Sequence, residues 1–163
     1  MSNSIWDKRF LDLAQHISTW SKDPSTQVGA VLTQGKHIVG LGYNGFPRGI
    51  QDSDARLADR PTKYKFIVHA EVNAILMAGD KAKNSTLYVY PSFAIPCICN
   101  ECCKVAIQAG VKEIVGYKPK QDDRQSRWSD SISVSKQMCD EAGVNYRAYE
   151  DICRRSNEQL SLF

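Results

Sequence analysis

The 163-residue sequence lacks the features of several protein classes. No apolar run approaches the ~20 residues of a membrane span, and the segment MSNSIWDKRF contains no apolar core of a secretory signal. Neither sign of charge dominates, because 21 Lys and Arg residues against 18 Asp and Glu residues leave a net charge of only +3. Internal repeats, low-complexity tracts and linkers are absent. We therefore expect one cytoplasmic domain, residues 1–163, with neither a membrane nor a nucleic acid as a stable partner.

Segments with helical periodicity alternate with segments typical of strands. Apolar residues recur at helical spacing from Ile5 to Ile17, whereas Thr86 to Tyr90 is β-branched and aromatic. This alternation predicts an α/β fold with at least one parallel crossover. Residues 50–65 are polar and charged, and we expect a long loop there. The expected helices cover residues 5–21, 70–78, 101–109 and 129–142, and the expected strands cover 28–33, 37–43, 86–90, 113–117 and 145–149.

Four of the six cysteines lie close together, at positions 97, 99, 102 and 103. A small secreted scaffold would use such a set for disulfides, but this chain exceeds the ~100 residues of such scaffolds and shows no export signal. Adjacent cysteines such as Cys102 and Cys103 also pair poorly with each other. We therefore interpret the cluster as a metal-binding or redox site.

His69 completes a candidate zinc site with two of these cysteines. It begins a predicted helix, with Glu71 two residues later, and Cys99 and Cys102 begin another helix with both thiols on one side. The positive end of the helix dipole favours thiolates, which are the form that zinc binds. One imidazole, two thiolates and an open fourth position are typical of catalytic Zn²⁺.

Several motifs together resemble the deoxycytidylate (dCMP) deaminase family of zinc-dependent cytidine and deoxycytidylate deaminases. They are a His-x-Glu element followed by a Cys-x-x-Cys element, a pattern known from zinc-dependent base deaminases, together with a Gly-Tyr-Asn-Gly element that free-cytidine and tRNA adenosine deaminases lack. The resemblance spans residues 5–149. The segments that carry it are Ser21 to Thr26, Gly42 to Gly49, Val68 to Glu71 and Gln108 to Val111.

The chain departs from the family at the cysteines. The family has Pro-Cys-x-x-Cys, but Pro96-Cys97 is followed three residues later by Asn100. Alignment on residues 104–110 assigns Cys99 and Cys102 and places Ile98 at the proline position, and this pair also has the spacing usual for zinc thiolates. The pairs Cys97/Cys102 and Cys99/Cys103 remain alternatives, since a thiol four residues after Cys99 faces the same side of the helix.

The resemblance implies a fold, a reaction and several site residues. The fold is a three-layer α/β/α sandwich of the cytidine deaminase type, with a mixed sheet of about five strands. The reaction is hydrolysis of dCMP to dUMP and ammonia, which supplies dUMP for thymidylate synthesis, with zinc activating water and Glu71 carrying protons. Asn44 would contact the sugar, and Ala70 would line the substrate site. Tyr117 is a further candidate for lining the site, because it lies at the end of a predicted buried strand. A turn role for Asn44 and an edge-packing role for Tyr117 stay open.

The family resemblance also implies regulation. Members commonly form homohexamers that dCTP with Mg²⁺ activates and dTTP inhibits. Glycines admit close backbone approach, and cationic and aromatic side chains suit phosphate and base. Packing of Tyr43 and Phe46 in an interface is the alternative. The residues carried over to this site are Lys22, Asp23, Gly42, Tyr43, Gly45, Phe46 and Arg48.

The substrate phosphate and the function class leave alternatives open. No single cation stands out as the phosphate ligand, and the pool comprises Arg48, Arg56, Arg60, Lys63, Lys65, Lys118, Lys120, Arg124 and Arg127. A deaminase of dCTP, cytidine or a nucleic-acid base is one alternative. A structural zinc or thiol module that binds a partner is another, although such a module would use four protein ligands.

Overall fold

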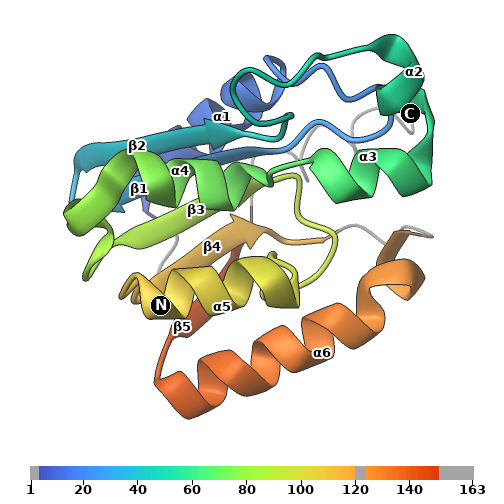
Figure 1. The fold of residues 1–163 in the computed structure, drawn as a ribbon. Coiled ribbons are helices and arrows are strands. Elements are labelled where there is room, and N and C mark those ends of the chain that lie inside the picture. Colours follow the sequence, from blue (N-terminus) through green and yellow to red (C-terminus); the bar gives the residue numbers. More distant parts are fainter. Residues whose placement is uncertain (1–3, 120–123, 151–163) are drawn as a thin grey trace, which may run out of the picture.

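A mixed five-stranded sheet forms the centre of the molecule (Figure 1). The structure, a computed structural model, describes residues 4–119 and 124–150. The strand order is β2-β1-β3-β4-β5; β1 pairs antiparallel with β2 and β3, whereas β3, β4 and β5 run parallel. This agrees with the expected α/β fold and parallel crossover. The strands are β1 (Gly29–Gln34), β2 (His37–Tyr43), β3 (Thr86–Tyr90), β4 (Glu113–Tyr117) and β5 (Asn145–Tyr149).

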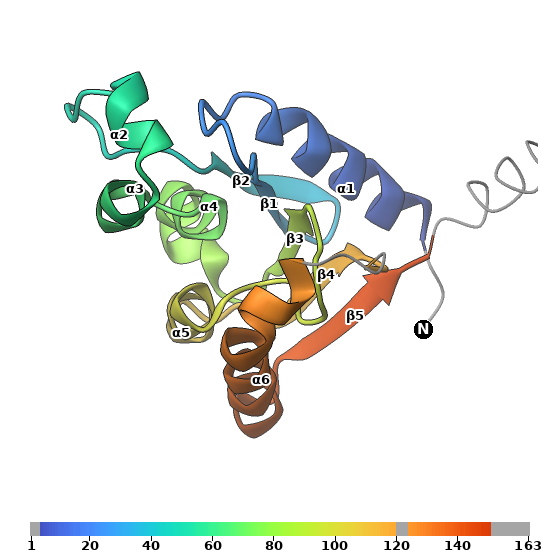
Figure 2. The ribbon, with the colours of Figure 1, turned by 90° about the vertical axis from the view of Figure 1, so that its right-hand side faces the viewer.

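Helices cover both faces of the sheet, which confirms the expected three-layer sandwich. One face carries α1 (Ile5–Ser18), and the other carries α4 (Ala70–Ala78), α5 (Asn100–Gln108) and α6 (Arg124–Ala142) (Figure 2). Each helical layer buries its own apolar cluster against the sheet. Among the described residues, no helix is both long and apolar enough to span a membrane.

Glycines in β2 let α4 pack directly on the sheet. A Cβ at Gly40 would clash with the carbonyl of Ala74, and one at Gly42 would clash with the carbonyl of Ala70. This close approach fixes the start of α4, where His69 and Glu71 lie, relative to the strands.

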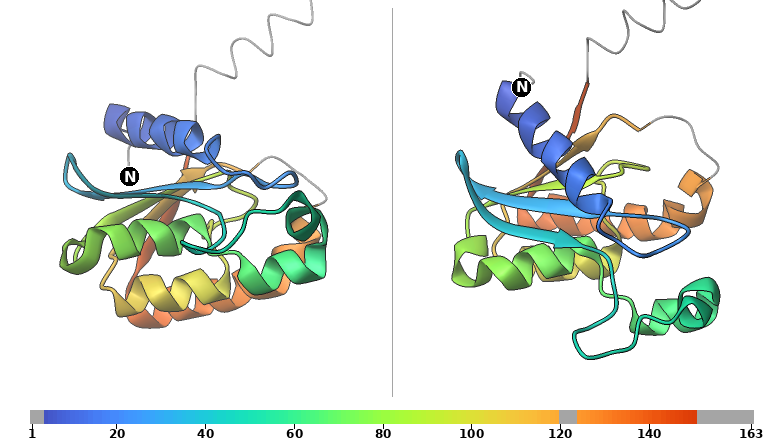
Figure 3. Two further views of the ribbon diagram at one scale, coloured as in Figure 1. Left: turned by 45° about the horizontal axis from the view of Figure 1, so that its top comes forward. Right: turned by 90° about the horizontal axis from the view of Figure 1, so that it is seen from above.

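Residues 50–65 differ from the expected loop, because much of this segment is helical. It contains α2 (Asp54–Ala58) and α3 (Arg60–Phe66), and a short 3₁₀ helix, η1 (Gly79–Ala82), follows α4. Ser53 caps α2 by accepting a hydrogen bond from the Arg56 amide, and Asp59 caps α3 in the same way. Figure 3 shows α2 and α3 at the same end of the sandwich as the start of α6.

Candidate active site

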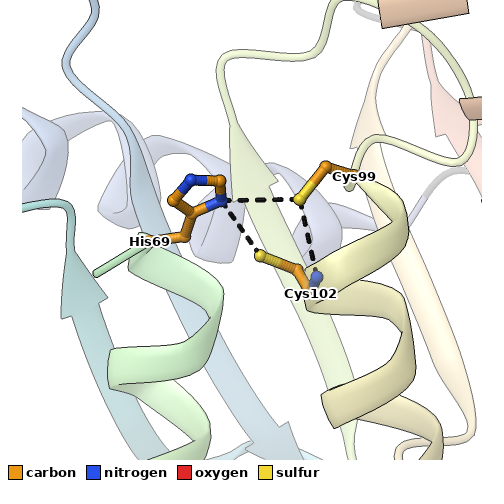
Figure 4. Close-up of side chains that lie close together, drawn as sticks. All are labelled: His69, Cys99 and Cys102. Carbon is orange, nitrogen blue, oxygen red and sulfur yellow. Dashed lines mark hydrogen bonds between the residues drawn. The ribbon is translucent and has the colours of Figure 1, made fainter. Parts of the chain in front are cut away.

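His69, Cys99 and Cys102 bring their ligand atoms together between the starts of α4 and α5. The His69 Nδ1 lies 3.2 Å from the Cys102 Sγ and 3.4 Å from the Cys99 Sγ (Figure 4). All three ligand atoms lie within 4.8 Å of one another. His69 is the N-cap of α4 and Cys99 the N-cap of α5, so the positive ends of two helix dipoles meet at this point.

The donor set fits zinc. An imidazole nitrogen at about 2.0 Å and a thiolate sulfur at about 2.3 Å from one tetrahedral ion lie roughly 3.5 Å apart, close to the separations seen here. Among the described residues, no further His, Cys, Asp or Glu joins the cluster. Three ligands are typical of a catalytic site, which keeps one position for water or substrate.

The thiol and imidazole groups perturb one another's pKa values. A side-chain hydrogen bond from Cys102, together with His69, lowers the pKa of Cys99 to about 4. The hydrogen bond to Cys99 raises the pKa of His69 to about 9, and the bond to Cys99 also raises the pKa of Cys102. Cys99 is therefore poised as a thiolate, the protonation state that zinc requires.

The other two cysteines of the 97–103 segment point elsewhere. Cys103 is fully buried, with its Sγ 3.5 Å from the Cys139 Sγ of α6. Cys97 lines the adjacent cavity but lies outside the three-residue cluster, and burial raises its pKa to about 12. Of the three cysteine registers, the geometry brings together the Cys99/Cys102 pair.

A cavity of about 210 Å³ opens beside the cluster. Glu71, in the first turn of α4, lines this cavity and is almost completely buried. Burial raises the pKa of Glu71, and the charges that act on it belong to His69 and Cys99 rather than to a lysine or arginine. The cavity wall comes from residues 23–28, α3, the start of α4, residues 89–99 and the start of α6.

The predicted substrate residues occupy different places. Ala70 and Asn44 line the cavity, and the Asn44 amide is engaged within the protein, accepting from the Val28 amide at 2.8 Å and donating to the Thr26 carbonyl at 2.9 Å. Tyr117 is not among the cavity-lining residues. Its hydroxyl donates to Asp12 at 2.7 Å, and its ring packs edge-on against neighbouring tyrosines on the α1 side of the sheet.

Sequence reasoning missed several residues of the cavity wall. Tyr64 lies on α3, within the segment predicted above as a loop. The sequence signal for this helix is Asp59 at the N-cap, followed by Pro61 in the first turn. Phe93 lies in the loop after β3, and Trp128 lies on α6. These aromatics carry no local motif, so only the fold brings them to the site.

Most of the residues carried over to the regulatory site lie around a second hollow, of about 120 Å³. Lys22 pairs with Asp52 at 2.8 Å there, and Trp20 packs edge-on against Tyr43. Gly42 packs against α4 instead, and Arg48 is not among the residues of the hollow. The predicted residues that line it are Lys22, Asp23, Tyr43, Gly45 and Phe46.

Known proteins are similar to this chain in sequence and in fold. A family model described as "Cytidine and deoxycytidylate deaminase zinc-binding region" matches residues 4–118. The chain is 42% identical over 144 residues to an uncharacterized deaminase in the luxG 3' region of Aliivibrio fischeri, covering 86% of this chain and 91% of that protein. It is 35% identical over 159 residues to the deoxycytidylate deaminase of Homo sapiens, covering 92% of this chain and 83% of that protein.

A solved structure also shares the fold. The dCMP deaminase of cyanophage S-TIM5, crystallised with dCMP and dUMP, matches with a TM-score of 0.67 at 24% identity. The match covers 91% of this chain and 99% of the cyanophage chain. At this identity the likeness describes the architecture that surrounds the cavity.

Proposed function

This chain belongs to the cytidine and deoxycytidylate deaminase family, and from that premise we propose that it hydrolyses dCMP to dUMP and ammonia. The observation that carries the proposal is the cavity whose lining includes His69, Cys99 and the buried Glu71. The human relative's name, deoxycytidylate deaminase, supports dCMP over other cytosine compounds. The product dUMP would supply thymidylate synthesis.

The groups at the cavity have two roles in this reaction, metal binding and proton transfer. Zinc held by His69, Cys99 and Cys102 would supply a Lewis acid that makes water nucleophilic near neutral pH. Glu71 takes the proton that the attacking water releases and delivers it to ring N3. It then takes the proton of the hydroxyl group now on C4 and passes it to the amino group, so that the C4–N bond breaks, ammonia leaves and the C4 carbonyl forms. Its burial raises its pKa, which makes the carboxyl group a better proton carrier than an exposed glutamate.

Ammonia release and bound metal test the proposal together. The purified protein is assayed with dCMP, dCTP, cytidine and deoxycytidine, and its zinc content is measured. We expect one zinc per chain and rapid ammonia release from dCMP. Faster release from dCTP or cytidine would reassign the substrate, and bound zinc without release from any of the four would indicate a binding module.

We further propose that the second hollow is a regulatory nucleotide site. Binding of dCTP with Mg²⁺ there would activate the enzyme, and binding of dTTP would inhibit it. Cationic Lys22 and aromatic Tyr43 and Phe46 at its edge suit a phosphate and a base. The test is the dCMP saturation curve with each effector, in the wild type and in Lys22→Ala. A curve that neither effector shifts would argue against regulation.

Self-association and location complete the proposal. Leu76 and Met77 on the outer side of α4 are 70% and 66% exposed, and such apolar exposure supports a homo-oligomer, for which we propose a hexamer. Light scattering of the purified protein measures the mass of the oligomer directly.

We also propose that residues 1–163 act as one domain in the cytoplasm, which would be the host's cytoplasm for a viral protein. Microscopy of a tagged chain tests the location.

A further inference from the structure

One face of α3 points its side chains at the cavity. Arg60, Lys63 and Tyr64 are spaced by three and four residues along this helix, and all three line the cavity. Across from them, α6 contributes Arg127 and Trp128. Three of the nine candidate cations, Arg60, Lys63 and Arg127, therefore line the cavity of the proposed active site.

The charge of Lys63 is already neutralised. Its Nζ lies 2.9 Å from the Asp23 carboxylate, and both side chains are only 4% exposed. Asp23 also accepts hydrogen bonds from the backbone amides of Ser25 and Thr26, so the pair fastens α3 to the 23–26 turn. A buried pair of this kind is a structural anchor and leaves no charge to offer a ligand.

Arg60 and Arg127 keep their charges. Neither forms an ion pair with an acidic residue within residues 4–119 and 124–150, and both side chains are exposed. The acidic residues that line the cavity are Asp23, which Lys63 holds, and Glu71, which is buried. The exposed part of the cavity is therefore positive, whereas its buried part holds the cluster and the proton carrier.

Tyr64 orients one of the two arginines. Its hydroxyl accepts hydrogen bonds from Arg60 Nη2 at 2.8 Å and from Nε at 3.1 Å, and the guanidinium lies 5.3 Å from the ring centroid. A neutral acceptor holds the guanidinium in place without cancelling its charge. The remaining N–H groups stay available for an anion.

We infer that Arg60 and Arg127 bind the phosphate of a nucleoside monophosphate at the cavity mouth and so set the preference for dCMP over deoxycytidine and dCTP. The inference rests on the proposed function. A phosphate monoester carries nearly two negative charges at pH 7, which two guanidiniums balance, and their planar donors match its oxygens. A triphosphate carries more charge than these two groups balance. With the base beside Glu71, the phosphate end of the nucleotide faces the exposed arginines.

The experiment compares Arg60→Gln, Arg127→Gln and the double variant with wild type, using dCMP and deoxycytidine as substrates. Each single change should raise KM for dCMP by roughly 10-fold, as expected for a lost charge-assisted hydrogen bond, with kcat within about 2-fold. The double change should raise KM further, and kcat/KM for deoxycytidine should stay constant. Arg9→Gln is the matched control, because Arg9 stacks on Trp6 away from the cavity.

A KM for dCMP that the double variant leaves unchanged would overturn the inference, as would an equal loss with dCMP and deoxycytidine. Arg60→Lys and Arg127→Lys, which keep the charge, should recover part of the lost affinity and so separate binding from misfolding. Calorimetric binding of dUMP to the same variants gives a readout that needs no turnover. If the wild type releases no ammonia from dCMP, the proposed function fails, while weaker dUMP binding by the variants still supports the phosphate site.

Discussion

Asp7 and Glu71 are both buried carboxylates, 2% and 5% exposed, but they lie on opposite sides of the sheet in opposite electrostatic settings. Asp7 is in α1 and Glu71 is in α4. Burial alone disfavours the charged form of both. The groups around each carboxylate decide whether it holds a charge permanently or exchanges a proton.

Asp7 is surrounded by donors. Burial raises its pKa, but hydrogen bonds from Arg147, the Ser4 amide and Tyr88 outweigh burial and lower the pKa below its usual value. The Arg147 Nη2 lies 2.8 Å from Asp7, and the same guanidinium binds Glu113 at 3.0 Å. This network ties α1 to β3, β4 and β5, so the charge of Asp7 serves the fold.

Glu71 forms no ion pair with an arginine or lysine among the described residues. Burial raises its pKa, and the side chains that lower it, His69 and Cys102, both belong to the proposed zinc cluster. A carboxyl group whose pKa is raised by burial accepts a proton more readily than an exposed one, whereas Asp7 is held in its charged form by the hydrogen bonds from Arg147. At similar burial, this difference distinguishes the structural carboxylate of Asp7 from the proton carrier that we propose at Glu71.

The largest expected effect is on turnover in Glu71→Gln. The amide keeps the shape of the side chain but cannot carry a proton, so we expect kcat for dCMP to fall by about 10³-fold. Zinc content should stay at the wild-type level, since Glu71 lies outside the ligand cluster. Steady-state ammonia release and metal analysis measure the two quantities.

Asp7→Asn is the matched control for this comparison, because it removes a carboxylate of similar burial from the other face. Its kcat per folded molecule should equal that of the wild type. Near-normal turnover in Glu71→Gln, or a comparable loss in Asp7→Asn, would abolish the distinction between the two acids.

The second prediction concerns the cluster beside Glu71. Cys99→Ser should weaken the zinc affinity at least 100-fold, because a hydroxyl is a much poorer zinc ligand than the thiolate that it replaces. Cys103→Ser and Cys97→Ser should keep zinc, since neither thiol joins the cluster. Metal content after dialysis against a chelator of graded strength measures the affinities. Zinc loss in Cys103→Ser as well as in Cys99→Ser would select the Cys99/Cys103 pair. Zinc loss in Cys97→Ser, with Cys99→Ser unaffected, would select the Cys97/Cys102 pair.

Much of the fold and of the metal site was predictable because its signals are local. The alternation of apolar residues located all five strands to within a residue, and His69, Cys99 and Cys102 carry the metal chemistry in two short motifs. The α2 and α3 helices were not predicted, because they are short and charged and because their N-caps, Ser53 and Asp59, are residues that are also common in turns.

The pairing of charges was not predictable. Arg60 and Lys63 are indistinguishable in a basic segment until the fold places Asp23 beside one of them. Asp7 likewise has no local sign of its partner, since Arg147 lies at the other end of the described chain. Long-range contacts therefore decide which charges are structural and which remain for a ligand.

The third prediction concerns stability. Asp7→Asn should lower the free energy of unfolding at pH 7 by about 3 kcal/mol, because it breaks a buried ion pair. The pKa of Asp7 is lower in the folded state, so the contribution is present above its unfolded pKa, near 3.8, and is lost as the pH falls through the folded value. The difference between variant and wild type should therefore shrink below about pH 4, measured by urea unfolding across pH 7 to 3.

Asp140→Asn supplies the control for that measurement. Asp140 accepts a hydrogen bond from Tyr146 at 2.7 Å on the surface, and the loss should stay within about 0.5 kcal/mol. A difference for Asp7→Asn that persists undiminished at pH 3 would show that packing, rather than charge, accounts for it.

The smallest expected effect tests a buried polar group without either role. Thr33 in β1 is 1% exposed, and its buried hydroxyl has no hydrogen-bond partner within the described chain. Hydrogen bonds to its partners offset the loss of hydration when Asp7 is buried, whereas this hydroxyl only loses its hydration on folding. Thr33→Val replaces it with a methyl group, so we expect the free energy of unfolding to rise by about 1 kcal/mol with turnover unchanged. A fall in urea stability would reveal that the hydroxyl is bonded, for which a buried water is the natural partner.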